Sequence, residues 1–107
     1  MTEPALFILA SLARGELHGY GIARDVEELS AGQVRLTAGT LYGALNRLSD
    51  EGLVEAAGER QVQGRRRRYY RLTAEGHSAL VAEVERLRRA TRVLSARLSA
   101  GPTPRPA

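Results

Sequence analysis

The sequence contains no cysteine, no tryptophan and no lysine, and it has only two histidines. Without cysteine the chain can form neither a disulfide nor the usual thiolate metal sites. His18 and His77 lie far apart with no ligand-like partner nearby, so we expect no metal site and no bound cofactor. No apolar stretch approaches the ~18 residues that a membrane-spanning helix needs, and no basic segment precedes the first apolar run. We therefore expect no membrane span, no export signal and a cytoplasmic location.

Motifs for catalysis are also missing. The sequence has no nucleophile motif, phosphate-binding loop or metal signature. Its adjacent acid pairs, Glu27–Glu28 and Asp50–Glu51, fall in predicted helices, where neighbouring side chains point in different directions. We therefore expect that the protein is not an enzyme. A chain of 107 residues with an apolar share of 43% fits one small domain with a thin core, which an oligomer interface would help to stabilise.

Positive charge, by contrast, is concentrated in one place. The net charge is +4, and residues 60–71 contain six arginines and no acid. The rest of the chain carries ten arginines and twelve acidic residues, so the whole positive excess lies in this stretch. A compact basic patch on a nearly neutral body is typical of a surface that binds phosphate groups.

Apolar spacing and capping residues predict the first three helices. Residues 4–13 indicate a short buried helix, and residues 18–29 carry an apolar stripe that ends near Gly32. Thr37 is a typical N-cap for a third helix, and Gly52 fits the position just beyond its end. Leucines repeat along one side of this third helix. The opposite side is small or polar and could enter a major groove; it carries Gly39, Tyr42, Gly43, Asn46 and Asp50.

Short strands are predicted between and after these helices. Residues 33–36 alternate between polar and apolar side chains, which indicates a brief strand. Residues 53–58 and 65–72 read as two strands of a hairpin around a glycine-bounded loop at 59–64. Because the arginine run leads directly into the second of these strands, we expect it to form part of an ordered surface rather than a detached tag.

The last helix is predicted to begin after Thr73, with Glu75 in its first turn where the helix dipole favours an acid. Apolar side chains and one threonine follow a heptad spacing along it. No opposing helix is evident within the chain, so a second copy could supply one. The predicted dimer interface consists of Leu80, Val84, Leu87, Thr91, Leu94 and Leu98.

The resulting element order is helix, helix, short strand, helix, hairpin and long helix. This is the order of a winged helix-turn-helix domain with an added terminal helix, a fold that is mainly α with a small β-hairpin. We expect a DNA-binding domain over residues 1–73, a dimerisation helix over 74–100 and a disordered, proline-rich tail over 101–107.

Three stretches carry a more specific resemblance: HGYGIARDVEE, GTLYGALNRLSDEGLV and GRRRRYYRLTAEGHSAL. Together they resemble the signature stretches of the PadR family of bacterial transcriptional regulators, over about residues 6–98. The family pattern usually has Ser-Pro before Gly39 and Pro after Tyr42, whereas this chain has Thr-Ala and Gly there. The chain is most similar to the short subfamily, which has a single C-terminal helix.

The resemblance implies a homodimer that binds a double-stranded DNA operator, usually as a repressor, with the C-terminal helix in the dimer interface. It also implies that a small-molecule effector could bind at that interface, as in some members of the family. Two other interpretations stay open from the residues alone. The chain could be a winged-helix module that binds protein or RNA without operator specificity, or a nonspecific nucleoid-type binder.

Candidate DNA contacts come from the third helix and the arginine hairpin. Asn46 is the best candidate base reader, because its amide can bond an adenine edge bidentately. The arginines would hold phosphates along the backbone or minor groove. The predicted DNA-binding residues are Thr37, Gly39, Thr40, Tyr42, Asn46, Arg47, Arg65, Arg66, Arg67, Arg68 and Arg71.

Overall fold

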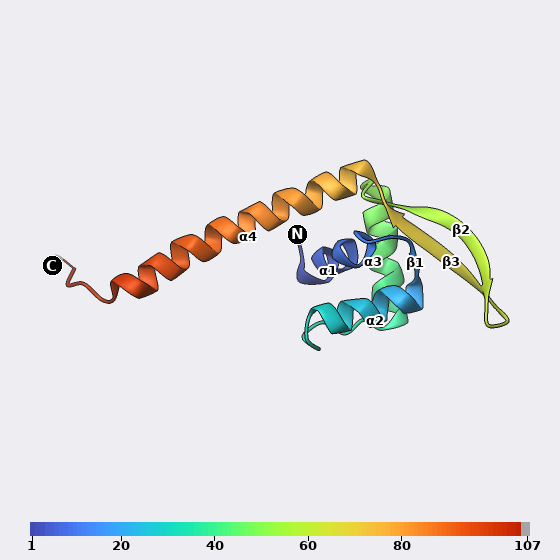
Figure 1. The fold of residues 1–107 in the computed structure, drawn as a ribbon, viewed down its shortest axis with the longest axis horizontal. Coiled ribbons are helices and arrows are strands. Elements are labelled where there is room, and N and C mark those ends of the chain that lie inside the picture. The colour runs from blue at the N-terminus through green and yellow to red at the C-terminus, as the bar shows by residue number, and fades with distance from the viewer. Residues whose placement is uncertain (106–107) are drawn as a thin grey trace.

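The computed structural model describes residues 1–105, which form four helices and a three-stranded antiparallel sheet (Figure 1). The predicted fold class, mainly helical with a small hairpin, is confirmed. In chain order the elements are α1 (Glu3–Leu12), β1 (Leu17–His18), α2 (Gly19–Leu29), α3 (Ala38–Asp50), β2 (Val54–Val62), β3 (Arg65–Leu72) and α4 (Ala74–Ala100).

Side-chain caps define where the helices begin. The Thr37 hydroxyl accepts a hydrogen bond from the Thr40 N–H at 3.3 Å, and the Thr73 hydroxyl accepts one from the Gly76 N–H at 2.9 Å. Both predicted threonine caps are therefore confirmed. α2 is capped by His18, whose ring Nδ1 accepts from the Gly21 N–H at 3.1 Å. Each cap satisfies an N–H group that has no partner inside its own helix.

The hydrophobic core lies between α1, α2, α3 and the root of the hairpin. Leu9, Ile22, Leu45 and Val54 are almost fully buried, and each comes from a different element. Tyr70 of β3 is 7% exposed and closes the sheet side of this core. The core thus holds the root of the hairpin against the three helices, and it fixes the position of α3 relative to β3.

The predicted strand at residues 33–36 is wrong. The edge of β3 pairs instead with β1, through Leu17 opposite Tyr70 and a second residue pair beside it. The 33–36 backbone is held locally, because the Val34 N–H donates to the Ser30 hydroxyl at 2.9 Å. The sheet order is β1-β3-β2, so the element that completes the sheet precedes α2 rather than α3.

The hairpin is longer than predicted. Most of the predicted loop at 59–64 is strand, and the reversal takes only Gln63 and Gly64, both at positive φ, as favoured in two-residue hairpin turns. The register shifts between Ala56 and Glu59, which marks a β-bulge. We call β2 and β3 together the wing, and residues 59–68, beyond the bulge, its distal half. Figure 1 shows this half extending away from the helices.

α4 leaves the body of the molecule and makes it elongated, with extents of 68 × 27 × 22 Å (Figure 1). Only its beginning packs against the rest of the chain, where Gly76 and Glu83 are buried. Residues 101–105 form neither helix nor strand, and the last two residues of the predicted tail lie outside the described residues. Within residues 1–105, no helix has both the length and the apolar character needed to cross a membrane.

Candidate nucleic-acid interface

α3 has one buried and one exposed face, as predicted. Leu41, Leu45 and Leu48 are at most 4% exposed and pack into the core. Apart from its own helix turn, a Cβ atom added at Gly39 or Gly43 would meet no atom of the described residues within 4 Å, so another molecule can approach the helix backbone closely there. The predicted contact residues of this region are all exposed; they are Thr37, Gly39, Thr40, Tyr42, Asn46 and Arg47.

A cleft of about 420 Å³ brings the start of α3 and the wing to one surface. Its lining includes Tyr20 from α2, Tyr42 from α3 and Arg67 from β3. Tyr42 is 46% exposed, yet a Cβ placed on Gly19 would lie 2.5 Å from its hydroxyl oxygen. The Tyr42 ring therefore packs against the start of α2 and still presents a free surface.

The arginines of the wing fall into two groups. Arg60, Arg66 and Arg71 form ion pairs with acids that lie outside residues 60–71, so the basic stretch is less isolated than its sequence indicates. Arg65, Arg67 and Arg68 have no ion-pair partner among the residues that the structure describes. Arg67 is half-buried, whereas Arg65 and Arg68 are exposed. Their charge is the part of the wing that is free to meet phosphate.

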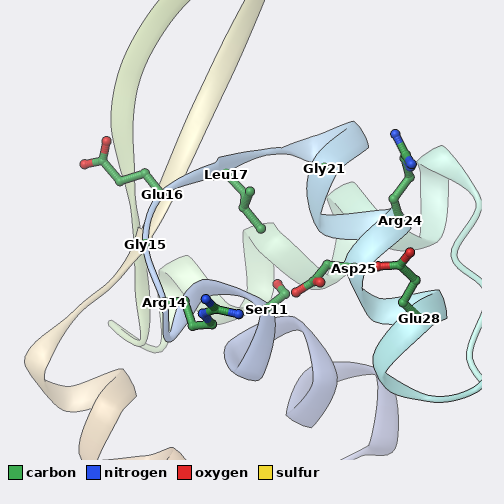
Figure 2. A pocket seen from close by; sticks show the side chains of 9 residues that line it. All are labelled: Ser11, Arg14, Gly15, Glu16, Leu17, Gly21, Arg24, Asp25 and Glu28. Atoms are coloured by element: carbon green, nitrogen blue, oxygen red, sulfur yellow. The ribbon is translucent and has the colours of Figure 1, made fainter.

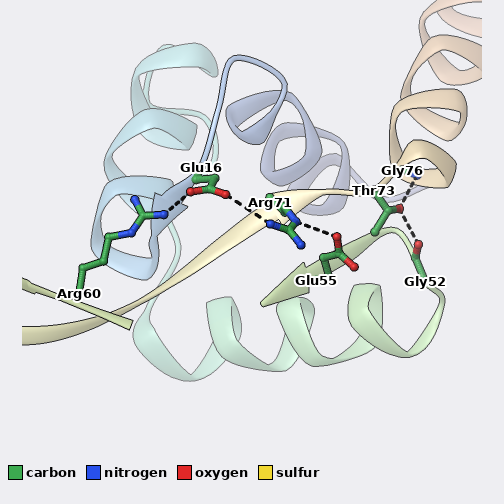
Figure 3. A network of polar contacts seen from close by, with 7 residues as sticks. All are labelled: Glu16, Gly52, Glu55, Arg60, Arg71, Thr73 and Gly76. Atoms are coloured by element: carbon green, nitrogen blue, oxygen red, sulfur yellow. Dashed lines mark hydrogen bonds and ion pairs between the residues drawn. The ribbon is translucent and has the colours of Figure 1, made fainter. Parts of the chain in front are cut away.

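The acids organise the base of the wing into a network (Figure 3). Glu16, in the turn before β1, accepts a hydrogen bond from Arg60 and lies 3.6 Å from Arg71 Nη1. The Arg71 Nε donates to Glu55 Oε1 at 2.7 Å. The hydrogen bond from Arg60 is the main reason why the pKa of Glu16 is lowered, and the hydrogen bond to Glu55 is the main reason why the pKa of Arg71 is raised.

Glu16 was not among the residues that the sequence predicted for the interface. It lies 44 positions before Arg60, in a turn with no motif of its own, so no local signal connects the two residues. Arg71 belonged to the predicted DNA-binding set. The structure places it at the base of the wing, with its guanidinium between the carboxylates of Glu16 and Glu55 (Figure 3).

Aromatic rings line the face of the wing that carries this network. The Arg60 guanidinium lies 4.1 Å from the centre of the Tyr69 ring, and His18 meets the same ring edge-on at 5.3 Å. Arg67 lies 5.7 Å from the Tyr20 ring, and its Nε is buried without a hydrogen-bond partner in the described part of the chain. Burial, followed by the positive charge of Arg67, lowers the pKa of His18.

Two further clefts lie away from the wing tip. Arg47, with Thr40, lines a cleft of about 870 Å³ between α3 and the start of α1. A second cleft, of about 370 Å³, lies between the end of α1 and α2 and carries charges of both signs (Figure 2). Its lining includes two arginines and three acidic residues, so this cleft is not a basic surface. Residues 1–105 contain no cluster of three or more side chains suited to hold a metal ion.

The predicted dimer seam lies on α4, but its members are not equivalent. Leu80 is partly buried against the core of its own chain. Beyond it the seam is open to solvent: Val84 and Leu87 are 37% and 39% exposed, and Leu94 and Leu98 are 63% and 82% exposed. Thr91 lies between these residues and is also exposed.

Comparison with known proteins identifies the family. Residues 8–82 match the family described as "Transcriptional regulator PadR-like family". The chain belongs to the PadR-like family. A transcriptional regulator of Mycobacterium tuberculosis is 41% identical over 78 residues, which cover 73% of this chain and 69% of that protein.

Solved structures of PadR proteins share the fold. A PadR family transcription regulator from Clostridium difficile matches with a TM-score of 0.77 and 28% identity, over 91% of this chain and 99% of that one. Bacillus subtilis PadR, solved in complex with operator DNA, matches with a TM-score of 0.64 and 28% identity, over 75% of this chain and 45% of that one. The resemblance stated from the three sequence stretches is therefore confirmed, and the chain is a PadR-like transcriptional regulator.

Proposed function

We propose that this PadR-like protein is a cytoplasmic homodimer that binds operator DNA as a repressor and has no catalytic activity of its own. The observation that carries the proposal is the single surface formed by α3 and the wing. Tyr42 of α3 and Arg67 of the wing line the same cleft. Farther along the wing, Arg65 and Arg68 are exposed and lack acidic partners within residues 1–105. The DNA complex of the related Bacillus subtilis PadR supports the same partner for this chain.

In this proposal α3 enters the major groove by its N-terminal half. Gly39 and Gly43 let the helix backbone approach the base edges. Asn46, two residues past the middle of α3, follows them into the groove and offers an amide that suits adenine. Asp50 and Glu51 are exposed at the other end of the helix, where their charge repels phosphate. Replacing these two acids with serine should therefore tighten nonspecific DNA binding. Unchanged or weaker binding in a nitrocellulose filter assay would contradict this orientation of α3.

The wing supplies the electrostatic part of the binding. Arg65 and Arg68 are free of ion pairs within the described chain, and Arg66 shares only one exposed contact, with Glu59 at 3.5 Å. Each phosphate that a wing arginine neutralises should lower the slope of log K against log salt by ~0.9. We place these contacts on the DNA backbone or in the minor groove beside α3.

The dimer is proposed to form through α4. A helix of 27 residues with an exposed apolar seam needs a partner, and the part that extends beyond the body finds none within residues 1–105. The chain then divides into a DNA-binding domain (1–73) and a dimerisation helix (74–100). An effector bound at the interface would be held by Phe7 and aliphatic side chains, because the chain has no tryptophan for stacking.

The experiment that tests this function begins by selecting duplexes from a randomised DNA pool with the wild-type protein. Binding of the enriched duplex and of a scrambled duplex is then titrated at several salt concentrations. We expect a clear preference for the enriched duplex together with a steep salt dependence. Steep salt dependence without preference would indicate a nucleoid-type binder. Indifference to DNA would indicate a protein- or RNA-binding module.

A further inference from the structure

The wing is tied to the helices by few contacts beyond its root. Its pairing with β1 covers two residues, Leu17 and His18, which lie opposite Tyr70 and Tyr69. The bulge between Ala56 and Glu59 then interrupts the ladder between β2 and β3. Beyond the root, the continuous backbone of β3 and side-chain contacts to the helices therefore have to hold the angle at which the distal half leaves the body.

Glu16 is placed to do this. It belongs to the turn between α1 and β1, which is part of the helical body, and Gly15 beside it has a φ of 149° that favours glycine. Its carboxylate accepts a hydrogen bond from Arg60, on the distal side of the bulge, and lies 3.6 Å from Arg71 Nη1, on the root side. One carboxylate of the body thus joins both halves of the wing (Figure 3).

Arg60 is well suited to receive this contact. Its guanidinium lies over the Tyr69 ring at 4.1 Å, so the side chain is held by both the ring and the carboxylate. Tyr69 is in turn held edge-on by His18. Arg60 therefore connects the distal half of the wing to Glu16 directly and to His18 through the Tyr69 ring.

We propose that Glu16 is a positioning residue for DNA recognition: it anchors the distal half of the wing through Arg60 and so sets where Arg65 and Arg68 meet the DNA relative to α3. The inference rests on the proposed function. In this proposal the guanidinium groups of Arg60 and Arg71 hold the wing in place through Glu16 and do not contact phosphate.

The length of the wing explains why a small anchor matters. Four residues separate the bulge from the turn, which corresponds to ~13 Å of extended strand at ~3.3 Å per residue. A tilt of ~15° at the bulge would then move the tip by ~3 Å, about the length of a hydrogen bond. A displacement of this size separates an arginine from its phosphate when α3 is seated in the groove, whereas a scrambled duplex can be held in any register.

Three single variants distinguish an effect of wing position on DNA recognition from an effect of net charge. Glu16→Gln removes a negative charge and the ion pair that forms the anchor, whereas Arg60→Gln removes a positive charge and the same ion pair. Glu59→Gln is the matched control, because it removes a negative charge from the wing and frees Arg66 without touching a contact to the body. Thermal unfolding of each variant checks that the domain stays folded.

The readout is the ratio of affinities for the enriched and scrambled duplexes described above. We expect Glu16→Gln and Arg60→Gln to lower this ratio by about tenfold each, although they change the net charge in opposite directions. The double variant should lose no more than either single one, since both remove the same interaction. Glu59→Gln should tighten binding to both duplexes and leave the ratio within about twofold of wild type.

A measurement without DNA tests the anchor itself. The chain has no cysteine, so Gln63→Cys at the turn of the wing gives a single site for a spin label. We expect higher label mobility with Glu16→Gln and Arg60→Gln than with Glu59→Gln or no second substitution.

Each outcome is decisive. Equal mobility in all variants, an unchanged ratio with Glu16→Gln, or an equal loss with Glu59→Gln would overturn the proposal. If no duplex is enriched by the wild-type protein, the proposed function is contradicted, and the label spectra alone then decide whether Glu16 anchors the wing.

Discussion

His18 links three parts of the structure through one imidazole ring. Its Nδ1 caps α2 by accepting from the Gly21 N–H at 3.1 Å, and the ring packs edge-on against Tyr69. Burial and the charge of Arg67 both disfavour the protonated ring, which is why the pKa of His18 is lowered from its usual value of 6.5. Protonation would also turn the accepting nitrogen into a donor and remove the cap.

The stability of the protein should therefore decrease as the pH falls below about 6.5. Between the lowered pKa of folded His18 and 6.5, the unfolded chain binds more protons than the folded chain. The stability that neutral His18 contributes is complete above this window and is lost as the pH falls through it. Urea unfolding at fixed protein concentration should show a smaller decrease between pH 7.5 and pH 5 in His18→Asn, since asparagine can cap α2 without titrating here. The account would be contradicted if His18→Asn lost as much stability over this pH range as the wild type does. It would also be contradicted if the control His77→Asn reduced the pH dependence as much as His18→Asn does.

Two glycines inside helices should respond in opposite ways to the same substitution. A Cβ on Gly76 of α4 would lie 2.0 Å from the Leu53 carbonyl oxygen, so Gly76→Ala forces the backbone apart. We expect it to lower the free energy of unfolding by ~1–3 kcal/mol. Gly43 of α3 has open space around it, and Gly43→Ala should raise the free energy of unfolding by ~0.5–1 kcal/mol. Denaturant titrations of both variants measure the two changes in the free energy of unfolding. Changes of the same sign would contradict the close contact between Gly76 and Leu53.

The helices were predictable because their signals are local. Thr37 and Thr73 cap helices with their own hydroxyl groups, and the glycine after α3, Gly52, has the positive φ that its position predicted. The leucine stripe of α3 follows from spacing alone and is buried as expected. These features need only residues a few positions apart, so one sequence contains all the information.

The strands were less predictable because they depend on distant partners. β1 is two residues long, and only its pairing with β3, more than fifty positions later, makes it a strand. The distal half of the wing carries polar side chains on both faces, since it extends past the core, and it therefore shows no apolar alternation. Leu80 follows the heptad spacing but packs against its own domain, because α4 begins there beside the core.

α4 as an element should carry dimerisation separately from the fold of the body. Leu94 and Val93 are neighbours with almost equal exposure, 63% and 61%, but only Leu94 belongs to the seam. Leu94→Glu should weaken the dimer by ~100-fold or more, because each of two chains loses ~1.5–3 kcal/mol of apolar burial. Val93→Glu should leave the dimer nearly unchanged. Sedimentation velocity over a range of concentrations measures both, and equal effects would contradict the seam.

At the scale of the whole molecule, the proposed DNA-binding helix and the proposed dimerisation helix are connected through direct contacts. The Thr73 hydroxyl donates to the Gly52 carbonyl at 2.6 Å, and Gly76 packs against the backbone of Leu53. The end of α3, the root of the wing and the start of α4 therefore meet at one joint (Figure 3). In a dimer held by α4, this joint would set the separation between the two α3 helices, and hence the spacing of operator half-sites.

The most direct test of the account is the salt dependence of operator binding after loss of Arg65 and Arg68, the two exposed wing arginines that have no ion pair within residues 1–105. The variant combines Arg65→Ala and Arg68→Ala, and a control combines Arg89→Ala and Arg92→Ala on α4, with the same change in charge. For a dimer we expect the slope of log K against log salt to become less negative by about 3 to 4 in the wing variant, and binding to weaken by more than ~100-fold at ~0.1 M salt. The control should remain close to wild type. Wild-type affinity and slope in the wing variant, with the dimer intact, would contradict the claim that the wing holds the DNA.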